Sequence, residues 1–407
     1  MGRMHGSTLY RAEGLDPLVA ISDDGPLMAT LGEVMLGWNI VPARDPQPGA
    51  EVAVRIEQGA KGWTCSGTTF DKPVTYADPV ATACSLIAAL YKAHTLTDRE
   101  GLFLHAAGVR IGPRAGGGLV LLSGHYRAGK SVVTTACAAA GLQVFSDDII
   151  PLDPDGRIAR APGLAIRLRL PLPDQMAPAT RDFVATHRIA SSERYVYIRP
   201  PPDRLAERGE AAPIRAVVSL HRAEDAPARL SSLAPGDALS ETIRRNFARA
   251  TPAGRILDAF DGLVAEVPCL RLSYGSAEEA ATLLRDTFEG ALPEFDADTQ
   301  AKTYSGRKRS PVRPLAGDAM IHRHPGANAR ERGGQAFLTD AEEAVIFHLN
   351  ATGTALWRLL EQPTPFGEII AVFAAGFPER DADALVSDLS RLIRDLAGSG
   401  LVRIEAR

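Results

Sequence analysis

The segment Ser123–Val133, SGHYRAGKSVV, carries residues suited to holding a phosphate. Gly124 is followed by four residues and then by Gly129, Lys130 and Ser131. In a loop with this spacing the backbone N–H groups face the phosphates, the lysine adds positive charge and the hydroxyl can ligate magnesium. The sequence therefore predicts a loop that binds ATP and Mg²⁺. Its residues, called the phosphate loop below, are Gly124, His125, Tyr126, Arg127, Ala128, Gly129, Lys130, Ser131 and Val132.

Two adjacent carboxylates, Asp147 and Asp148, follow the next apolar run, Leu142–Phe145. Neighbouring residues in a strand point to opposite faces, so the two side chains can do different work. One can hold magnesium, and the other can take the proton of a substrate hydroxyl. An ordinary turn is the alternative interpretation of an Asp-Asp pair. The position of the pair shortly after the phosphate loop favours the interpretation that it holds metal and accepts a proton.

His105 directly follows the apolar residues Phe103 and Leu104 and is a third candidate for an active-site residue. A lone histidine at the end of a strand is often a hydrogen-bonded core or edge residue. The alternative is an active-site role, in which it adjusts a neighbouring carboxylate or contacts phosphate.

Regular elements must position these side chains. GGGLVLLS predicts a buried strand at Leu119–Leu122 that runs into the phosphate loop, and KSVVTTACAAAG predicts a helix that ends at Gly141. LQVFSDD predicts a second buried strand that delivers Ser146 and the two aspartates to its C-terminal end. Folds of the α/β class place their ligand crevices at such ends.

Three motifs in order, FLHAAGVRI, LLSGHYRAGKS and VFSDDIIPL, resemble the catalytic domain of HPr kinase/phosphorylase over about residues 95 to 285. The resemblance implies that His105 is an active-site histidine and that Lys130 and Ser131 bind phosphate and magnesium. It also implies that Asp147 is the catalytic base and that Asp148 is the metal ligand. Whether a reverse phosphorylase activity exists stays open.

Basic residues are needed to neutralise charge that develops during phosphoryl transfer. Besides Lys130, the candidates are Arg127, Arg167, Arg169, Arg244 and Arg245. An ordinary surface position is the alternative for each arginine.

Composition limits the class of protein. The chain has 407 residues, of which 45% are hydrophobic and 23% are charged, which is enough for two or three domain cores. A net charge of −4 gives no support for a nucleic-acid or membrane-surface binder. The apolar stretches are too short to span a bilayer, and the N-terminus has no apolar signal core. Four scattered cysteines fit a reduced compartment, so we expect a cytoplasmic protein.

The C-terminal region has its own pattern. Strand-like runs at Gln335–Thr339 and Ala344–Leu349 are joined by an acidic turn, and Asn350 is placed to cap a helix. A second helix is expected near Thr364. A third carries the apolar stripe Leu385, Leu389, Leu392, Ile393 and Leu396 before LVRI resumes as a strand.

This pattern, with the FHLNATGTALWRLL core and the terminal GSGLV, resembles a PqqD-like domain over residues 313 to 407. Such domains recognise the leaders of ribosomally made peptides that are modified later. The resemblance implies β-augmentation, in which an extended leader adds a strand to the hairpin edge and contacts the third helix. A winged-helix-like structural cap is the alternative.

The expected fold is an α/β P-loop kinase core of the HPr kinase/PEP carboxykinase type, with a β-rich N-terminal region and a winged-helix-like α+β domain at the C-terminus. The expected division is a small domain at 1–95, the kinase-like core at 96–292, a linker at 293–312 and the peptide-binding domain at 313–407.

Together these features predict an ATP-dependent kinase that phosphorylates a serine or threonine of a precursor peptide captured by its leader. Two alternatives remain. One is a similar enzyme that acts on a folded carrier protein or a small metabolite, and the other is a non-catalytic, nucleotide-gated peptide carrier. We expect neither nucleic acid nor a membrane as partner, and the sequence leaves homo-oligomers open.

Overall fold

The computed structural model describes residues 3–4, 7–15, 17–22, 25–43, 52–112, 117–125, 127–224, 226–298 and 312–405. Tyr126 and residues 299–311 of the expected linker lie outside the described residues. Contacts divide the chain into two compact units. Unit 1 comprises Met1–Leu233, Arg244–Thr251 and Gly262–Ala297, and unit 2 comprises Ala234–Ile243, Pro252–Asp261 and Asp298–Arg407. The finer division into four parts stays a prediction.

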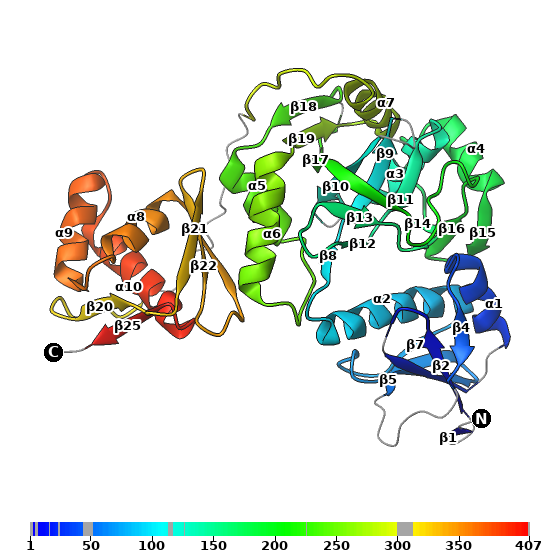
Figure 1. The fold of residues 1–407 in the computed structure, drawn as a ribbon, viewed down its shortest axis with the longest axis horizontal. Helices are drawn as coiled ribbons and strands as arrows, with labels where there is room; N and C mark the ends of the chain where they lie inside the picture. Colours follow the sequence, from blue (N-terminus) through cyan, green and yellow to red (C-terminus); the bar gives the residue numbers. More distant parts are fainter. Residues whose placement is uncertain are drawn as a thin grey trace. The chain divides into compact units, whose positions relative to one another are not determined.

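Unit 1 begins with a seven-stranded sheet and two helices (Figure 1). The strands are β1 (Arg3–Met4), β2 (Ser7–Ala12), β3 (Leu18–Ile21), β4 (Ile40–Pro42), β5 (Val52–Gly59), β6 (Gly62–Ser66) and β7 (Val74–Tyr76), and the helices are α1 (Gly25–Val34) and α2 (Pro79–Thr97). Asp78 caps α2 by accepting a hydrogen bond from the Ala81 N–H at 2.8 Å. The β-rich N-terminal region and its closing helix are therefore present.

A nine-stranded sheet forms the centre of unit 1. Its strands are β8 (Leu102–Leu104), β9 (Ala107–Ile111), β10 (Gly118–Gly124), β11 (Gln143–Ser146), β12 (Ile150–Leu152), β13 (Ile158–Arg160), β17 (Ala211–Arg222), β18 (Arg229–Ser232) and β19 (Cys269–Tyr274). β10 is parallel to β17, and β17 is parallel to β19. β9 lies antiparallel between β10 and β11. The C-terminal ends of β10, β11, β17 and β19 therefore point to the same edge of the sheet.

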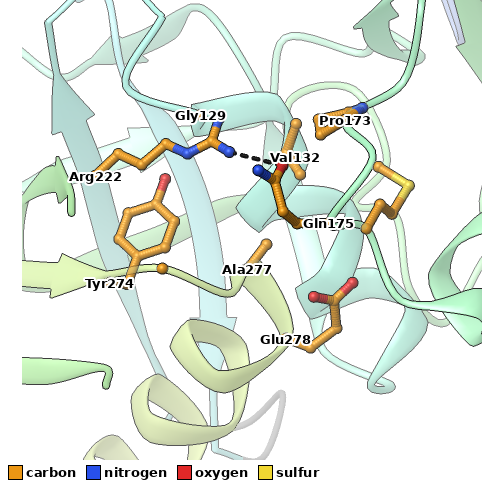
Figure 2. A pocket seen from close by; sticks show the side chains of 10 residues that line it. Gly129, Val132, Pro173, Gln175, Arg222, Tyr274, Ala277 and Glu278 are labelled. Atoms are coloured by element: carbon orange, nitrogen blue, oxygen red, sulfur yellow. Dashed lines mark hydrogen bonds between the residues drawn. The ribbon is translucent and has the colours of Figure 1, made fainter. Parts of the chain in front are cut away.

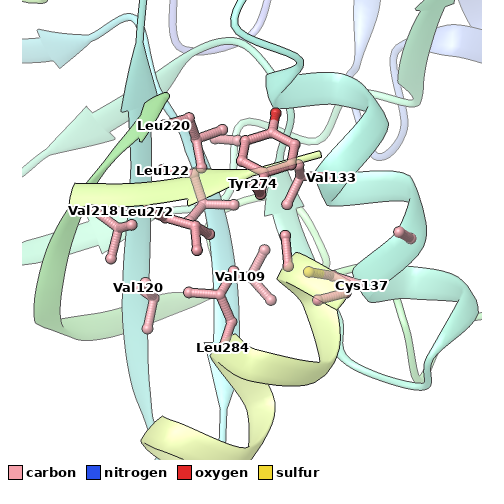
Figure 3. Close-up of a cluster of buried hydrophobic side chains, with 14 of the residues drawn as sticks. Val109, Val120, Leu122, Val133, Cys137, Val218, Leu220, Leu272, Tyr274 and Leu284 are labelled. Atoms are coloured by element: carbon pink, nitrogen blue, oxygen red, sulfur yellow. The ribbon is translucent and has the colours of Figure 1, made fainter. Parts of the chain in front are cut away.

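Two helices, α3 (Lys130–Ala139) and α7 (Ala277–Phe288), cover one face of this sheet (Figure 3). Alanines and Cys137 on α3 let it pack closely on the strands, and Leu284 of α7 is fully buried in the same core. The Ser276 side chain caps α7 by accepting from the Glu279 N–H. Gly141 follows the end of α3 and has φ +92°. This left-handed backbone conformation commonly terminates a helix, and glycine adopts it without steric cost. The strand and helix expected around the phosphate loop are confirmed.

A smaller sheet flanks α3 in unit 1. It consists of β14 (Ile166–Arg169), β16 (Tyr195–Ile198) and β15 (Arg188–Ser191), in that order, and it is accompanied by α4 (Pro178–Thr186). Ile166 and Ile198 are fully buried against Val144 of β11. This packing brings β14 close to the end of β11, where the aspartates follow.

Unit 2 contains α5 (Pro235–Ile243), the first turns of α6 (Ala253–Glu266) and the C-terminal elements. One sheet has the order β21 (Asn328–Arg332), β22 (Gln335–Thr339) and β23 (Ile346–Leu349), and another pairs β24 (Thr364–Pro365), β20 (Met320–Arg323) and β25 (Val402–Glu405). The helices are α8 (Ala351–Leu359), α9 (Phe366–Gly376) and α10 (Ala382–Gly398).

The C-terminal elements expected from the sequence are confirmed. The Asn350 side chain accepts from the Gly353 N–H at 3.0 Å and so caps α8. Ile393 and Leu396 of the α10 stripe are fully buried, as is nearly all of Trp357. The pattern did not predict β20 and β21, whose charged and half-exposed residues lack an apolar alternation.

Charged pairs join the hairpin of unit 2 to α5 and α6. Arg332 binds Asp261 through two hydrogen bonds, both 2.7 Å long, and Arg330 binds Asp258. The Gln335 side chain donates to Asp237 of α5 at 2.8 Å. These helices lie inside the stretch expected to be kinase core, and their partners are far away in the sequence.

Candidate functional site

The phosphate loop joins β10 to α3, and two of its glycines are sterically required. A Cβ on Gly124 would lie 2.8 Å from Ala128 Cβ and 3.2 Å from the Leu220 carbonyl oxygen. A Cβ on Gly129, which has φ +89°, would lie 2.4 Å from the hydroxyl oxygen of Tyr274. That hydroxyl donates a hydrogen bond to the Ala128 carbonyl. Tyr274 therefore buttresses the loop from the end of β19.

The loop backbone is shaped for an anion. Arg127 and Gly129 have left-handed conformations, with φ of 66° and 89°. Such residues, alternating with right-handed ones, turn successive N–H groups toward one point. α3 begins at Lys130, so its unpaired N–H groups add a partial positive charge. Lys130 is 9% exposed, and burial lowers its pKa while the charge of Asp148 opposes that shift.

Asp147 is buried at the end of β11, with 5% of its surface exposed. Burial raises its pKa to about 6, helped by the negative charge of Asp148 and opposed by Arg167 and a hydrogen bond from Ser131. Its Oδ2 has no hydrogen-bond partner. A buried carboxylate oxygen without a partner costs free energy, so this atom is suited to receive a proton or a cation.

Asp148 is held from two sides. His105 Nε2 lies 3.2 Å from its Oδ1, and the Arg167 guanidinium donates to its Oδ2 at 3.0 Å. The Ser146 hydroxyl oxygen accepts from the Asp148 N–H, which fixes the turn after β11. About a third of the Asp148 side chain is exposed, so it is accessible to a substrate.

His105 lies between β8 and β9, at the start of the strand that runs beside β10. Its backbone N–H donates to the Arg245 carbonyl at 2.8 Å. About half of the imidazole is exposed; burial of the rest lowers its pKa, and the charge of Asp148 opposes this shift. A neutral ring near pH 7 can donate one N–H to Asp148.

The structure brings together the predicted groups His105, Lys130, Ser131, Asp147 and Asp148. The arginine candidates differ in their positions. Arg167 contacts Asp148, Arg245 contacts His125 at 3.2 Å, and Arg169 lies over the Tyr195 ring.

Sequence reasoning missed the contribution of the N-terminal region. Arg167 donates to the sulfur of Cys84 on α2 at 2.6 Å, and Cys84 and Tyr197 line a pocket with the two aspartates. The other lining residues are Ile87, Ala88, Ile149, Leu164, Ala165 and Arg167. We call this the carboxylate pocket. Cys84 and Arg167 are far apart in the chain and belong to no common motif, so no sequence signal could have found their contact.

Unit 2 holds a second apolar pocket, formed by α9 and α10 beside the start of α8. Its lining residues are Thr352, Phe373, Phe377, Arg380, Leu385, Asp388, Leu389 and Leu392, and its cavity volume is about 110 Å³. We call it the helix groove. The strand that precedes α8, β23, pairs only with β22 among the described strands. Its other edge therefore has backbone groups that could pair with an added strand.

Comparison with known proteins supports part of this architecture. The family model described as coenzyme PQQ synthesis protein D (PqqD) matches residues 335–402. The chain carries a PqqD-like domain. This confirms the resemblance expected for the C-terminal region.

No curated protein matches the chain. Among solved structures, the chain is similar to the HPr(Ser) kinase/phosphatase from Coxiella burnetii, at 16% sequence identity and a TM-score of 0.23. The match covers 45% of this chain and 94% of that one. A likeness at this level fixes neither activity nor substrate.

Within the described residues, no helix is both long and apolar enough to cross a bilayer.

Proposed function

We propose that this protein is an ATP- and Mg²⁺-dependent kinase that phosphorylates a serine or threonine of a ribosomally made precursor peptide. One observation carries the proposal. The loop that presents Lys130 and Ser131 lies next to two carboxylates, of which Asp147 is buried with a raised pKa and Asp148 is fixed by His105 and Arg167. Perturbed carboxylates beside an anion-binding loop are typical of phosphoryl transfer.

The residues present fit a magnesium ion. Mg²⁺ bound with a nucleotide usually takes one or two protein oxygens, with phosphate and water as its other ligands. The Ser131 hydroxyl and one carboxylate of the aspartate pair supply such oxygens, and the unpartnered Asp147 Oδ2 marks a site short of positive charge. Bound there, the ion would neutralise and orient the terminal phosphates.

In the proposed reaction, the peptide hydroxyl oxygen attacks the γ-phosphorus of ATP. The bond from that phosphorus to the bridging oxygen breaks, and ADP leaves. Asp147 takes the hydroxyl proton, which its pKa of about 6 suits because a base works best near the ambient pH. Lys130 would stabilise the charge on the phosphates, and His105 and Arg167, which contact Asp148, would keep that carboxylate in place to hold the metal.

The exchanged assignment has support of its own. Ser131 hydrogen-bonds Asp147, so a metal held by the Ser131 hydroxyl would be close to Asp147. Asp148 is more exposed and lines the carboxylate pocket, so it could receive the proton instead. The Asp→Asn variants in the Discussion separate the two assignments.

The PqqD-like domain would capture the peptide by its leader. An extended leader can pair with the edge of β23 and place apolar side chains in the helix groove. Capture raises the effective concentration of the acceptor segment near the carboxylates, without any new contact to the reacting atoms.

A nucleotide-gated peptide carrier is the second candidate, favoured by the burial of Asp147. A base that is only 5% exposed must gain access to its substrate through the carboxylate pocket. A carrier would bind ATP and peptide but would transfer no phosphate.

The test uses the full chain with labelled ATP, Mg²⁺ and any short peptides that are encoded beside its gene. Mass spectrometry should locate one phosphate on a serine or threonine, and Lys130→Ala should lower the rate by on the order of a hundredfold or more. If Lys130→Ala phosphorylates the peptide at the same rate as the unaltered chain, the proposal of a kinase is refuted. ATP and peptide binding without transfer would favour the carrier.

A further inference from the structure

The segment Arg245–Phe247 lies beside β8 and reaches His105. The Phe247 N–H donates to the Phe103 carbonyl at 3.1 Å, and the two rings pack with their centroids 5.6 Å apart. The Arg245 carbonyl accepts a hydrogen bond from the His105 N–H at 2.8 Å. All of these residues belong to unit 1. Main-chain bonds therefore fix the backbone of Arg245 next to the histidine of the site.

The Arg245 guanidinium lies at the phosphate loop. Its Nη2 is 3.2 Å from Nδ1 of His125, and that ring nitrogen accepts the hydrogen bond because arginine can only donate. Burial lowers the pKa of Lys130, Asp148 opposes this shift, and the charge of Arg245 lowers the pKa further. The pKa of His105 is lowered by burial, and Arg245 again adds to the shift. The guanidinium is therefore close to the loop lysine and to the histidine.

This arrangement brings two positive charges, Lys130 and Arg245, to one place. Like charges repel each other, and Asp148, which offsets part of the repulsion, is already bound by Arg167. An anion between the two cations would be attracted by both. A P-loop lysine reaches the β- and γ-phosphates of a nucleotide. Arg245 is close both to Lys130 and to His105, which contacts Asp148, so the phosphate within its reach is the γ-phosphate, next to the carboxylates.

Other arginines near the loop are placed differently. Arg222, at the end of β17, donates to the Gln175 side chain at 3.0 Å (Figure 2). It lines a pocket with Gly129 that contains neither Asp147 nor Asp148, so it lies away from the acceptor side of the loop. The neighbour of Arg245 in the chain, Arg244, is exposed.

We propose that Arg245 is a catalytic residue that donates to the γ-phosphate of ATP and stabilises the charge on that group as its bond to the bridging oxygen breaks. The inference rests on the proposed function, because it assumes that the γ-phosphate is transferred at this loop. In such a transfer the charge is spread over three oxygens of the moving group. The planar guanidinium has five N–H donors, so it can bind two of these oxygens and keep its contact with His125. The assignment singles out one of the five arginines that the sequence left as candidates.

The experiment compares Mg-ATP and Mg-ADP as ligands of the full chain by calorimetry, because only ATP carries the γ-phosphate. Arg245→Ala should raise the dissociation constant of Mg-ATP about tenfold, the size expected for the loss of a charge-assisted hydrogen bond, and that of Mg-ADP less than about twofold. The same variant should lower kcat for peptide phosphorylation by on the order of a thousandfold. Alanine keeps the carbonyl that accepts from His105, so the fold should be retained, and thermal unfolding checks this.

Arg244→Ala is the matched control, because it removes the same charge from the exposed neighbour. It should change neither kcat nor the ratio of the two dissociation constants. If Arg245→Ala weakens both nucleotides equally or neither, or if Arg244→Ala has the same effects, the assignment of Arg245 is wrong while the kinase proposal stands. If the unaltered protein binds neither nucleotide or transfers no phosphate, both proposals fail.

Discussion

His105 Nε2 lies 3.2 Å from Asp148 Oδ1, and the other oxygen of this carboxylate is held by Arg167. His105 lies between β8 and β9, and Asp148 follows β11, so the fold brings together two residues that are far apart in the chain. The imidazole can donate one N–H to Asp148. In the proposed reaction, His105 would be a positioning residue that acts through Asp148.

Replacing His105 tests that role. His105→Ala should lower kcat by on the order of a hundredfold, because small displacements of catalytic groups have effects of this size. The dissociation constant for Mg-ATP should change little. His105→Gln retains a donor and should recover part of the rate. Equal losses in both variants, together with lost ATP binding, would show a structural role instead.

Replacing each of the two aspartates by asparagine should distinguish their roles. Asp147→Asn should bind Mg-ATP and fail to transfer phosphate, because an amide cannot take the proton. Asp148→Asn should instead weaken the binding of Mg²⁺, which is measured as a higher magnesium concentration for half-maximal activity. The reverse pattern would assign the base to Asp148 and the metal to Asp147.

Asp147 also predicts a pH dependence of stability without nucleotide. Its pKa is raised from 3.8 to about 6 in the folded state, so folding is favoured by protonation of this group. That stability is fully present below pH 4 and is lost as the pH rises through 6. The free energy of unfolding of Asp147→Asn should therefore be higher than that of the unaltered chain by about 3 kcal/mol at pH 7. Urea unfolding at pH 4 and pH 7 measures this, and an equal difference at both values would contradict it.

Gly129 should be irreplaceable for a steric reason beyond its backbone angle. Gly129→Ala places a Cβ 2.4 Å from the Tyr274 hydroxyl, whereas Gly141→Ala, at a similar φ of +92°, meets no atom within 4 Å. Both variants carry backbone strain of about 1–2 kcal/mol. Only Gly129→Ala should also lose ATP binding. If both variants bind ATP normally, the contact with Tyr274 does not shape the loop.

The helix groove should govern peptide affinity and leave the chemistry unchanged. Leu392→Glu puts a charge into the groove and should raise KM for the precursor about tenfold or more while kcat is kept, because docking stabilises ground and transition states alike. Val372→Glu is the control, since this exposed apolar residue of α9 does not line the groove. A fall in kcat at unchanged KM, or equal effects of both variants, would remove the groove from leader recognition.

The sequence by itself predicted the features that a local pattern of residues determines. The spacing of Gly124, Gly129 and Lys130 predicted the loop, and the apolar runs beside it predicted β10, α3 and β11. The same holds for Asn350 as the cap of α8 and for the α10 stripe. These features depend on hydrogen bonds and periodicity within a few residues, which the order of the residues specifies directly.

Only the tertiary structure decided which distant groups meet. The sequence placed Asp147 and Asp148 together but could not show that one is buried without a partner for Oδ2 while the other is gripped by His105 and Arg167. Nothing in the order of the residues joins Cys84 to Arg167, or Tyr274 to the carbonyl of Ala128. Tyr274 meets the loop because β10 and β19 run parallel to β17 and end at the same edge of the sheet. Cys84 meets Arg167 because α2 of the N-terminal region packs beside β14 of another sheet. Burial and pKa depend on all neighbours in space, so they are properties of the packed fold and have no local pattern in the chain.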